Sequence, residues 1–210
     1  MRLIAAVVSS LTVMVVIAIG ASPIVLAAES PVSARQVETP APSTFEELVA
    51  GSGLSYTRPA GFQETPVVVN GLWSYEHAVL KTDSNVEIRY AVRPIERMEI
   101  AYDDPHSNAP DPNHIFPMMF QTLIGLLSDG RHTPSREYPP DQARSKFNAN
   151  WAAAALFDVD PRFTEQFKLA LMIAMHKNNL ADAYAIYLFN DYEQAKPVIN
   201  ATMDSLKFLP

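Results

Sequence analysis

Residues 167–189 read FKLALMIAMHKNNLADAYAIYLF, two almost uninterrupted apolar runs on either side of a short polar segment. The runs cover residues 167–175 and 183–189, and the tetrapeptide at 176–179, His-Lys-Asn-Asn, has the composition of a turn. Strands that are apolar on both sides are typical of strands covered on both faces. We therefore predict a hairpin in a sheet that has helices on both sides.

A second hairpin is predicted upstream, from residues 73–81 and 86–94 around a loop at 82–85. The cross-strand pairs that this loop aligns are Val79 with Ile88, His77 with Tyr90 and Tyr75 with Val92, and Trp73 shares their face. The opposite face takes Glu76, Ala78, Leu80, Glu87, Arg89, Ala91 and Arg93. A slip of one residue would exchange the two sets, so we expect the first set to form the core face, with His77 as a hydrogen-bonded interior histidine.

Three helices are predicted. The first follows the capping-box sequence at 43–46 and ends at the glycines around 51–53. The second covers 115–127, where apolar residues recur with helical spacing. The third covers 192–206 and contains Pro197, which we expect in its first turn because proline is poorly tolerated deeper in a helix.

The remaining segments complete an α+β pattern. Residues 54–57 and 149–157 are predicted strands, and 102–114 and 130–146 are predicted loops because they are polar and rich in proline. Hairpins outnumber the places where a parallel crossover fits. The expected fold is a mainly antiparallel sheet with helices on both faces, an α/β/α sandwich formed by residues 43–210.

The order of these elements resembles the Mog1/PsbP-like superfamily. The residues that carry the resemblance are 54–62, LSYTRPAGF, a strand followed by a Pro-x-Gly-Phe turn, and the closing block, an apolar hairpin and a helix that ends in Ser-Leu-Lys-Phe at 205–208. The resemblance covers residues ~43 to 210. It implies an α/β/α sandwich and a non-catalytic accessory or partner-binding role, and it assigns no functional residue.

The N-terminus predicts where in the cell the protein is located. Arg2 precedes an uncharged apolar run at 3–28, with small residues at a cleavage site near Ala27 or Ala28. This is the form of a secretory signal peptide, so we expect a periplasmic or secreted protein; an uncleaved membrane anchor is the alternative. Residues 29–42, rich in Pro, Ser and Ala, are expected to be a disordered tether. The chain has no cysteine, which excludes a lipoprotein and a disulfide framework and, together with export, suggests a bacterial envelope protein.

The charge of the chain limits its partners. Of 16 basic and 23 acidic residues, the run at 1–28 holds one basic residue and no acidic one, so the rest carries 15 against 23, a net charge of −8. Nucleic acids and anionic lipid surfaces require positive patches. We therefore expect neither nucleic acid nor, after signal cleavage, a membrane as a partner, and instead an envelope protein or a small ligand.

The charged face of the 73–94 hairpin is the candidate ligand-binding site, with Glu76, Glu87, Arg89 and Arg93. The two arginines lie four residues apart on one face, about 13 Å along the strand. Two guanidinium groups in an open groove would hold a carboxylate or another anion. The alternative is internal pairing of the arginines with the two glutamates, since buried charge needs a partner.

Two other groups of polar residues stand out in the sequence. The loop at 102–114 offers oxygen and imidazole donors: Asp103, Asp104, His106, Asn108, Asp111, Asn113 and His114. It lacks EF-hand and HExxH spacing, which favours a solvated loop over an ion site. His176 and Asp182 flank the turn of the later hairpin and could transfer protons, but no nucleophile lies nearby in sequence, and polar turn ends are the simpler interpretation.

The sequence therefore predicts an exported, non-enzymatic accessory or binding module without catalytic residues, bound metal or cofactor. Two alternatives remain. One is a periplasmic metal-assisted hydrolase that uses the Asp/His loop at 103–114. The other is a carrier for a small apolar ligand held between the sheet and a helix.

Overall fold

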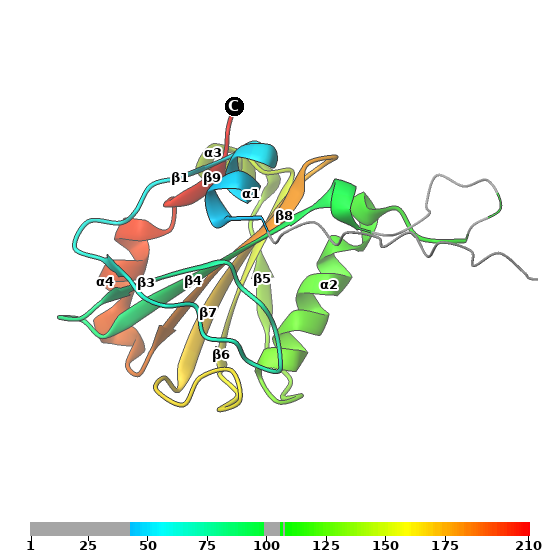
Figure 1. Cartoon of the computed structure of the whole chain (residues 1–210). Coiled ribbons are helices and arrows are strands. Elements are labelled where there is room, and N and C mark those ends of the chain that lie inside the picture. Colours follow the sequence, from blue (N-terminus) through cyan, green and yellow to red (C-terminus); the bar gives the residue numbers. More distant parts are fainter. Residues whose placement is uncertain (1–42, 99–105, 107) are drawn as a thin grey trace, which may run out of the picture. The chain divides into compact units, whose positions relative to one another are not determined.

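The two predicted hairpins form the middle of an antiparallel sheet in the computed structural model, which describes residues 43–98, 106 and 108–210 (Figure 1). The later hairpin consists of β7 (Leu169–Lys177) and β8 (Ala181–Phe189), and the earlier one of β3 (His77–Lys81) and β4 (Val86–Pro94). β4 pairs with β8, so the hairpins lie side by side. The predicted leader at 1–28, the tether at 29–42, and Asp103 and Asp104 lie outside the described residues.

The full sheet has seven strands in the order β2-β3-β4-β8-β7-β6-β5, each antiparallel to its neighbours. Its outer strands are β2 (Gln63–Glu64), β6 (Trp151–Asp158) and β5 (Ser135–Glu137). A separate two-stranded sheet joins β1 (Leu54–Tyr56) to β9 (Leu206–Phe208). The predicted α+β class with a mainly antiparallel sheet is confirmed.

Helices cover both faces, as predicted from the two-sided apolar strands. On one face, α1 (Phe45–Gly51), α3 (Pro140–Phe147) and α4 (Tyr192–Thr202) share a hydrophobic core with the sheet. On the other face, α2 (Pro112–Leu127) forms a second core with it. Figure 1 shows α2 standing apart from α1 and α4 across the sheet. The residues of β8 alternate strictly between the two cores, because successive side chains of a strand point to opposite faces.

The register predicted for the earlier hairpin is confirmed over its paired residues: His77 lies opposite Tyr90, and Val79 opposite Ile88. His77 is half-buried and hydrogen-bonded, not fully interior as predicted. Its Nε2 lies 3.1 Å from the Tyr56 hydroxyl, its ring stacks on Phe45, and burial lowers its pKa.

The prediction for residues 73–76 was wrong. β3 begins at His77, so the alternation of faces does not extend back to Trp73 and Tyr75. Tyr75 belongs to the α2-side core and Trp73 packs against it, on the face opposite to Val79. The change of face follows from a bend at Glu76, whose backbone N–H donates to the carbonyl oxygen of Tyr90 although His77 is the residue paired with Tyr90, so one extra residue separates Tyr75 from the strand.

The loop prediction for 130–146 was also wrong, because this segment contains β5 and most of α3. The consecutive prolines that suggested a loop instead start a helix: Pro140 occupies its first position, where a missing N–H costs nothing. Ala143 and Phe147 then give the helix one buried side, and Asn148 ends it in the left-handed conformation.

The last predicted helix is shorter than expected. α4 ends at Thr202, and Leu206–Phe208 form β9 instead of its final turn. Pro197 lies inside the helix and not in its first turn. The position is exposed, so water can bind the carbonyl group that loses its helical hydrogen bond.

Candidate ligand-binding pocket

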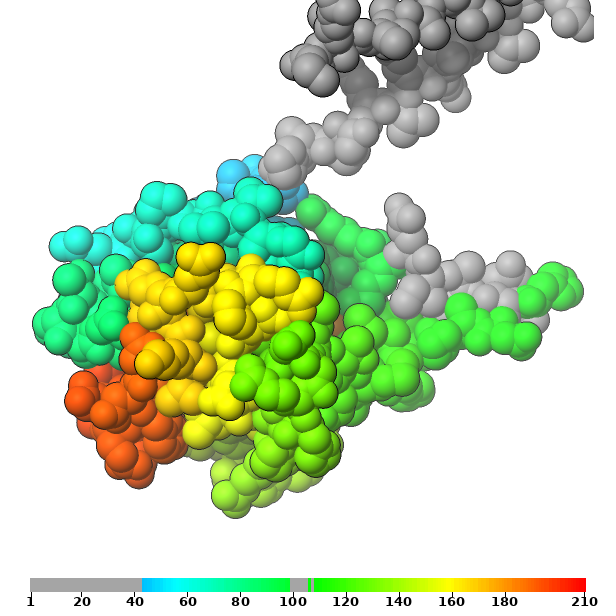
Figure 2. Space-filling view, turned by 90° about the horizontal axis from the view of Figure 1, so that it is seen from below, coloured from blue at the N-terminus to red at the C-terminus, as the bar shows by residue number. Residues whose placement is uncertain are grey.

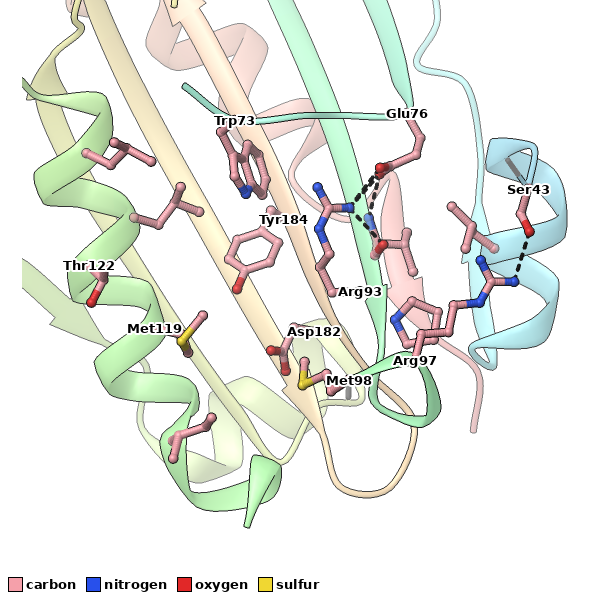
Figure 3. A pocket seen from close by; sticks show the side chains of 16 residues that line it. Ser43, Trp73, Glu76, Arg93, Arg97, Met98, Met119, Thr122, Asp182 and Tyr184 are labelled. Carbon is pink, nitrogen blue, oxygen red and sulfur yellow. Dashed lines mark hydrogen bonds and ion pairs between the residues drawn. The ribbon is translucent and has the colours of Figure 1, made fainter. Parts of the chain in front are cut away.

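A pocket of about 750 Å³ lies between α2, the end of β4 and β8, and extends to Ser43 and Leu48 at α1. Most of its wall is apolar: Trp73, Val92, Ile115, Met119, Leu123 and Leu126. Figure 3 shows α2 on one side of the pocket, with the sheet behind it and α1 on the far side.

α2 can form this wall because it is apolar over more of its surface than the core uses. Its buried side packs Phe116, Phe120 and Leu127 into the α2-side core. Met119 and Leu126 line the pocket and keep 44% and 41% of their surface exposed. An apolar stripe wider than the buried face leaves a surface that a ligand can cover.

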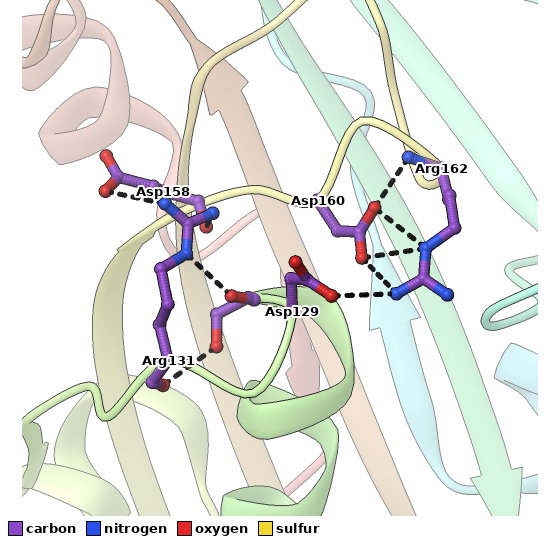
Figure 4. Close-up of polar contacts among 6 residues, drawn as sticks. Asp129, Arg131, Asp158, Asp160 and Arg162 are labelled. Atoms are coloured by element: carbon purple, nitrogen blue, oxygen red, sulfur yellow. Dashed lines mark hydrogen bonds and ion pairs between the residues drawn. The ribbon is translucent and has the colours of Figure 1, made fainter.

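The C-terminal end of α2 is held in place by a polar cluster of Asp129, Arg131, Asp158, Asp160 and Arg162 (Figure 4). The backbone N–H of Asp160 donates to the carbonyl oxygen of Leu127, the last helical residue, at 2.7 Å. The Arg162 guanidinium group contacts the carboxylates of Asp160 and Asp129 at 2.5 and 3.1 Å. These bonds fix the helix that forms the pocket wall.

The loop that carries this cluster also reaches the far strands of the sheet. Seen from below, residues 159–168 lie beside the end of α2 and the segment between β2 and β3 (Figure 2). The Phe163 ring lies 6.2 Å from the Tyr75 ring, and its carbonyl oxygen accepts a bond from Arg89. The loop therefore packs into the α2-side core.

The four predicted site residues separate into two ion pairs, and one of these lines the pocket. Arg93 Nη1 lies 2.8 Å from the Glu76 carboxylate, and its Nη2 donates to the carbonyl oxygen and the hydroxyl of Ser74. The guanidinium group also stacks over the Trp73 ring, 5.0 Å from its centre. Arg93 and Glu76 thus form a neutralised polar end of the pocket (Figure 3).

Arg89 and Glu87 form the other pair and do not line the pocket. Arg89 Nε lies 2.5 Å from a Glu87 carboxylate oxygen, and the guanidinium group is packed between the rings of Tyr75 and Phe163. Arg89 is only 4% exposed. The geometry is that of internal pairing, and the two arginines do not meet in one groove.

β8 places two further polar groups on the pocket floor, Asp182 and Tyr184. Asp182 Oδ1 lies 2.7 Å from Nδ1 of His176, its cross-strand neighbour on β7. Both partners are buried, and the Phe116 ring stacks on the imidazole. Burial raises the pKa of the Asp182 carboxyl, against the opposing effect of the hydrogen bond with His176.

The sequence signal for this floor was present but was interpreted only as a turn. His176 is the second-last residue of β7 and Asp182 is the second residue of β8. The two are paired across the strands and do not lie in the loop between them. The alternation along β8 puts Asp182 on the same face as Tyr184 and Ile186. If the two predicted strands had been extended by two residues toward the turn, His176 and Asp182 would have been predicted as a polar pair on a sheet face covered by a helix.

Arg97 lies at the rim, where the 3₁₀ turn Ile95–Arg97 follows β4. Its Nη2 donates to the Ser43 hydroxyl at 2.9 Å. Among the described residues it forms no ion pair, so its charge is open to solvent and to the pocket mouth.

The structure describes only part of the loop at 103–114 that was the alternative metal site. Asp111 caps the N-terminus of α2, and Asn113 bonds to Asn179, so these two residues have local structural roles. Within 43–98, 106 and 108–210 no three acidic, histidine or cysteine side chains gather closely enough to bind a metal. In the same ranges no helix has the length and apolar character needed to cross a bilayer.

Comparisons of the sequence with protein-family models and with curated proteins find no match.

Proposed function

We propose that this chain is an exported, non-enzymatic binding protein whose pocket holds a small, mainly apolar ligand. The observation that carries the proposal is the pocket of about 750 Å³ between α2 and the sheet. Ligand sites of proteins are concave, largely apolar and supplied with a few polar groups, with volumes of roughly 300–1,000 Å³. This pocket has all three properties.

The exposed side chains on its wall supply a driving force. Met119 and Leu126 are more than one-third exposed, and an apolar ligand would remove them and its own surface from water. Burying about 200 Å² of apolar surface contributes roughly 5 kcal/mol before the cost of association. That is enough for a binding site of ordinary strength and requires no covalent chemistry.

The polar groups at the pocket support binding more than turnover. Glu76 is neutralised by Arg93, and Asp182 is hydrogen-bonded to His176. The Nε2 atom of His176 has no hydrogen-bond partner in the described part of the chain, so no hydroxyl group is placed for activation by that imidazole. A nucleophile next to a base is the usual mark of covalent catalysis.

Export belongs to the same proposal. The apolar run at 3–28 after Arg2, the polar segment that follows it and the absence of cysteine support a bacterial envelope location. The net charge of −8 calculated for the rest of the chain supports a role without nucleic acid. Kinship with the accessory proteins of the Mog1/PsbP-like superfamily is proposed on the sequence resemblance.

The binding proposal is tested with the neutral apolar dye N-phenyl-1-naphthylamine, whose fluorescence rises in apolar sites. Met119→Trp puts a larger side chain into the pocket wall, and Met118→Trp is its matched control, because Met118 is exposed on the same helix but does not line the pocket. We expect saturable binding to the wild-type chain. Met119→Trp should raise the Kd about tenfold, and Met118→Trp less than about twofold.

Native mass spectrometry of the protein purified from cells provides an independent measurement, since a retained ligand adds a discrete mass. Failure of the dye to bind saturably, together with an adduct-free spectrum, would overturn the proposal. Equal weakening by the two tryptophan variants would also overturn it, because the dye would then bind outside the pocket.

A further inference from the structure

The floor of the pocket contains two buried polar groups that the protein satisfies only in part. Asp182 and Tyr184 are 3% and 4% exposed. A carboxylate can accept about four hydrogen bonds, yet within the described residues the Asp182 side chain makes one, to His176. The Tyr184 hydroxyl has no hydrogen-bond partner in that part of the chain, although a phenol both donates and accepts.

Both groups face the pocket. They lie two residues apart on β8, so their side chains project from the same face of the sheet, about 6.6 Å apart along the strand. Figure 3 shows both side chains within the pocket, with the Tyr184 hydroxyl directed toward α2. Neither the free Asp182 oxygen nor the Tyr184 oxygen is among the fully enclosed atoms that lack partners, so a bound molecule can reach them.

The apolar surroundings of Asp182 and Tyr184 favour ligands that can form hydrogen bonds with them. Trp73, Met119 and Leu123 form the apolar wall around them. Leaving a polar group unpaired in apolar surroundings is costly, so buried polar groups are nearly always hydrogen-bonded. An apolar ligand that covers them without a polar group of its own would leave them unpaired, whereas a ligand with a hydrogen-bond donor would satisfy them.

His176 holds the carboxylate in place. It lies opposite Asp182 on β7, is 2% exposed, and is fixed from the α2 side by the Phe116 ring at 5.1 Å. Asp182 also lies opposite Arg93 on β4, but the guanidinium donors of Arg93 go to Glu76, Ser74 and the Val92 carbonyl oxygen. One carboxylate oxygen is therefore held by His176 while the other is left for a ligand.

We propose that Asp182 and Tyr184 bind a hydroxyl or ammonium group of an amphiphilic ligand whose apolar part lies against α2. This inference rests on the proposed ligand-binding function and specifies the polar end of the ligand. Asp182 accepts a hydrogen bond from that group, the Tyr184 hydroxyl forms a second one, either as donor to a ligand hydroxyl or as acceptor from an ammonium group, and His176 is a positioning residue. The burial that raises the Asp182 pKa also strengthens its hydrogen bonds.

The test compares three probes with the same alkyl chain: dodecanol, dodecylamine and dodecyl methyl ether. The first two carry donors and the ether carries none. Each is measured by displacement of N-phenyl-1-naphthylamine, with the Kd of the dye determined separately for every variant. We expect the wild-type chain to bind the alcohol or the amine at least about tenfold more tightly than the ether.

Two conservative variants identify the residues. Tyr184→Phe removes only a hydroxyl, and Asp182→Asn keeps an acceptor for His176 while removing the charge. Each should weaken binding of the alcohol and the amine severalfold more than binding of the ether. The matched controls are Tyr192→Phe, at the start of α4, and Asp83→Asn, in the exposed β3–β4 turn, and both should leave the preference unchanged.

The outcomes separate this inference from the proposed function. If the ether binds as tightly as the alcohol and the amine, the inference is overturned, while pocket binding stands. If neither the dye nor any probe binds, the proposed function itself fails. Should Asp182→Asn not fold, the wild-type preference and the Tyr184→Phe variant still decide, because removing a hydroxyl next to an open pocket preserves packing. A preference for the amine over the alcohol would indicate an ammonium ligand, and the reverse order a hydroxyl ligand.

Discussion

Arg89 and Arg93 show how two identical side chains on one strand face acquire different roles. The side chains of Arg89 and Glu87 are 5% and 10% exposed, whereas those of Arg93 and Glu76 are 28% and 20% exposed. A charge that loses its partner in the interior is far more costly than one that water can reach. The first pair therefore belongs to the core, and the second to the edge of the pocket.

Replacing Arg89 by methionine should lower the free energy of unfolding by about 3–5 kcal/mol, because Glu87 is then left as an unpaired buried charge. Arg93→Met should cost about 1 kcal/mol, since Glu76 can be solvated. Urea unfolding monitored by circular dichroism measures both. The double variant Glu87→Leu with Arg89→Met is the control and should recover most of the loss, because it leaves no charge unpaired. Equal losses in the two single variants would contradict this account of burial.

At the scale of elements, α2 and the loop at its C-terminal end form one unit. Asp160 joins them, with its backbone bonded to Leu127 and its carboxylate to Arg162. The hydrogen bond from Arg162 lowers the pKa of Asp160 below its ordinary value of 3.8. A carboxyl group with a depressed folded-state pKa stabilises the fold above the unfolded-state pKa, and this stability is lost as the pH falls through the folded-state value.

Asp160→Asn, which mimics the protonated carboxyl group, should therefore destabilise the protein at pH 7. The difference from wild type should shrink as the pH falls below about 3.8, the ordinary pKa of the carboxyl group, toward the lower folded-state value. Urea midpoints measured for both proteins across this range provide the test. Asp158→Asn is the control, since the Asp158 side chain is 64% exposed and its ion-pair partner among the described residues is Arg131 alone. A difference that stays constant with pH would show that the cluster does not depend on the Asp160 charge.

The elements that the sequence predicted are those whose own residues specify them. The β7–β8 hairpin is apolar on both faces, and the spacing of Leu123 and Leu127 identifies α2 without reference to neighbours. β9 could not be predicted in this way, because it exists through pairing with β1, some 150 residues earlier in the chain. α3 was missed for a local reason: its two prolines have the same composition at a helix start as in a loop.

Two of the four residues predicted for the candidate site line the pocket, and two do not. Arg93 and Glu76 do line a pocket, and strand alternation had put Arg93 on the strand face opposite Val79 and Ile88. The separation of Arg89 from it depends on the Phe163 loop, whose position follows from long-range packing that no local pattern reveals. To predict that Asp182 and Tyr184 share the pocket floor, one would have to know that β8 begins at Ala181. The ends of strands are the part of an element that sequence patterns define least well.

On the scale of the whole molecule, apolar residues are distributed differently in the two parts of the sequence. The described residues within 43–210 pack apolar side chains into two cores on either side of the sheet. Residues 3–28 form an uncharged apolar run preceded by a single basic residue, which is the form that export machinery recognises. The proposed ligand-binding role depends on this segment only for its location, so folding and export can be tested separately.

Charges placed within the apolar run should block export without affecting the folded domain. The full chain with a C-terminal tag, produced in a bacterial host, should be recovered outside the cytoplasm with a mass that lacks residues 1–27 or 1–28. The double variant Val13→Arg with Val16→Arg should remain in the cytoplasm at full length, because two charges disrupt the apolar segment. Gln36→Arg with Val37→Arg adds the same charge downstream and should be exported normally. Recovery of the wild-type chain at full length from the membrane fraction would instead support the anchored alternative, and recovery at full length from the cytosol would overturn export altogether.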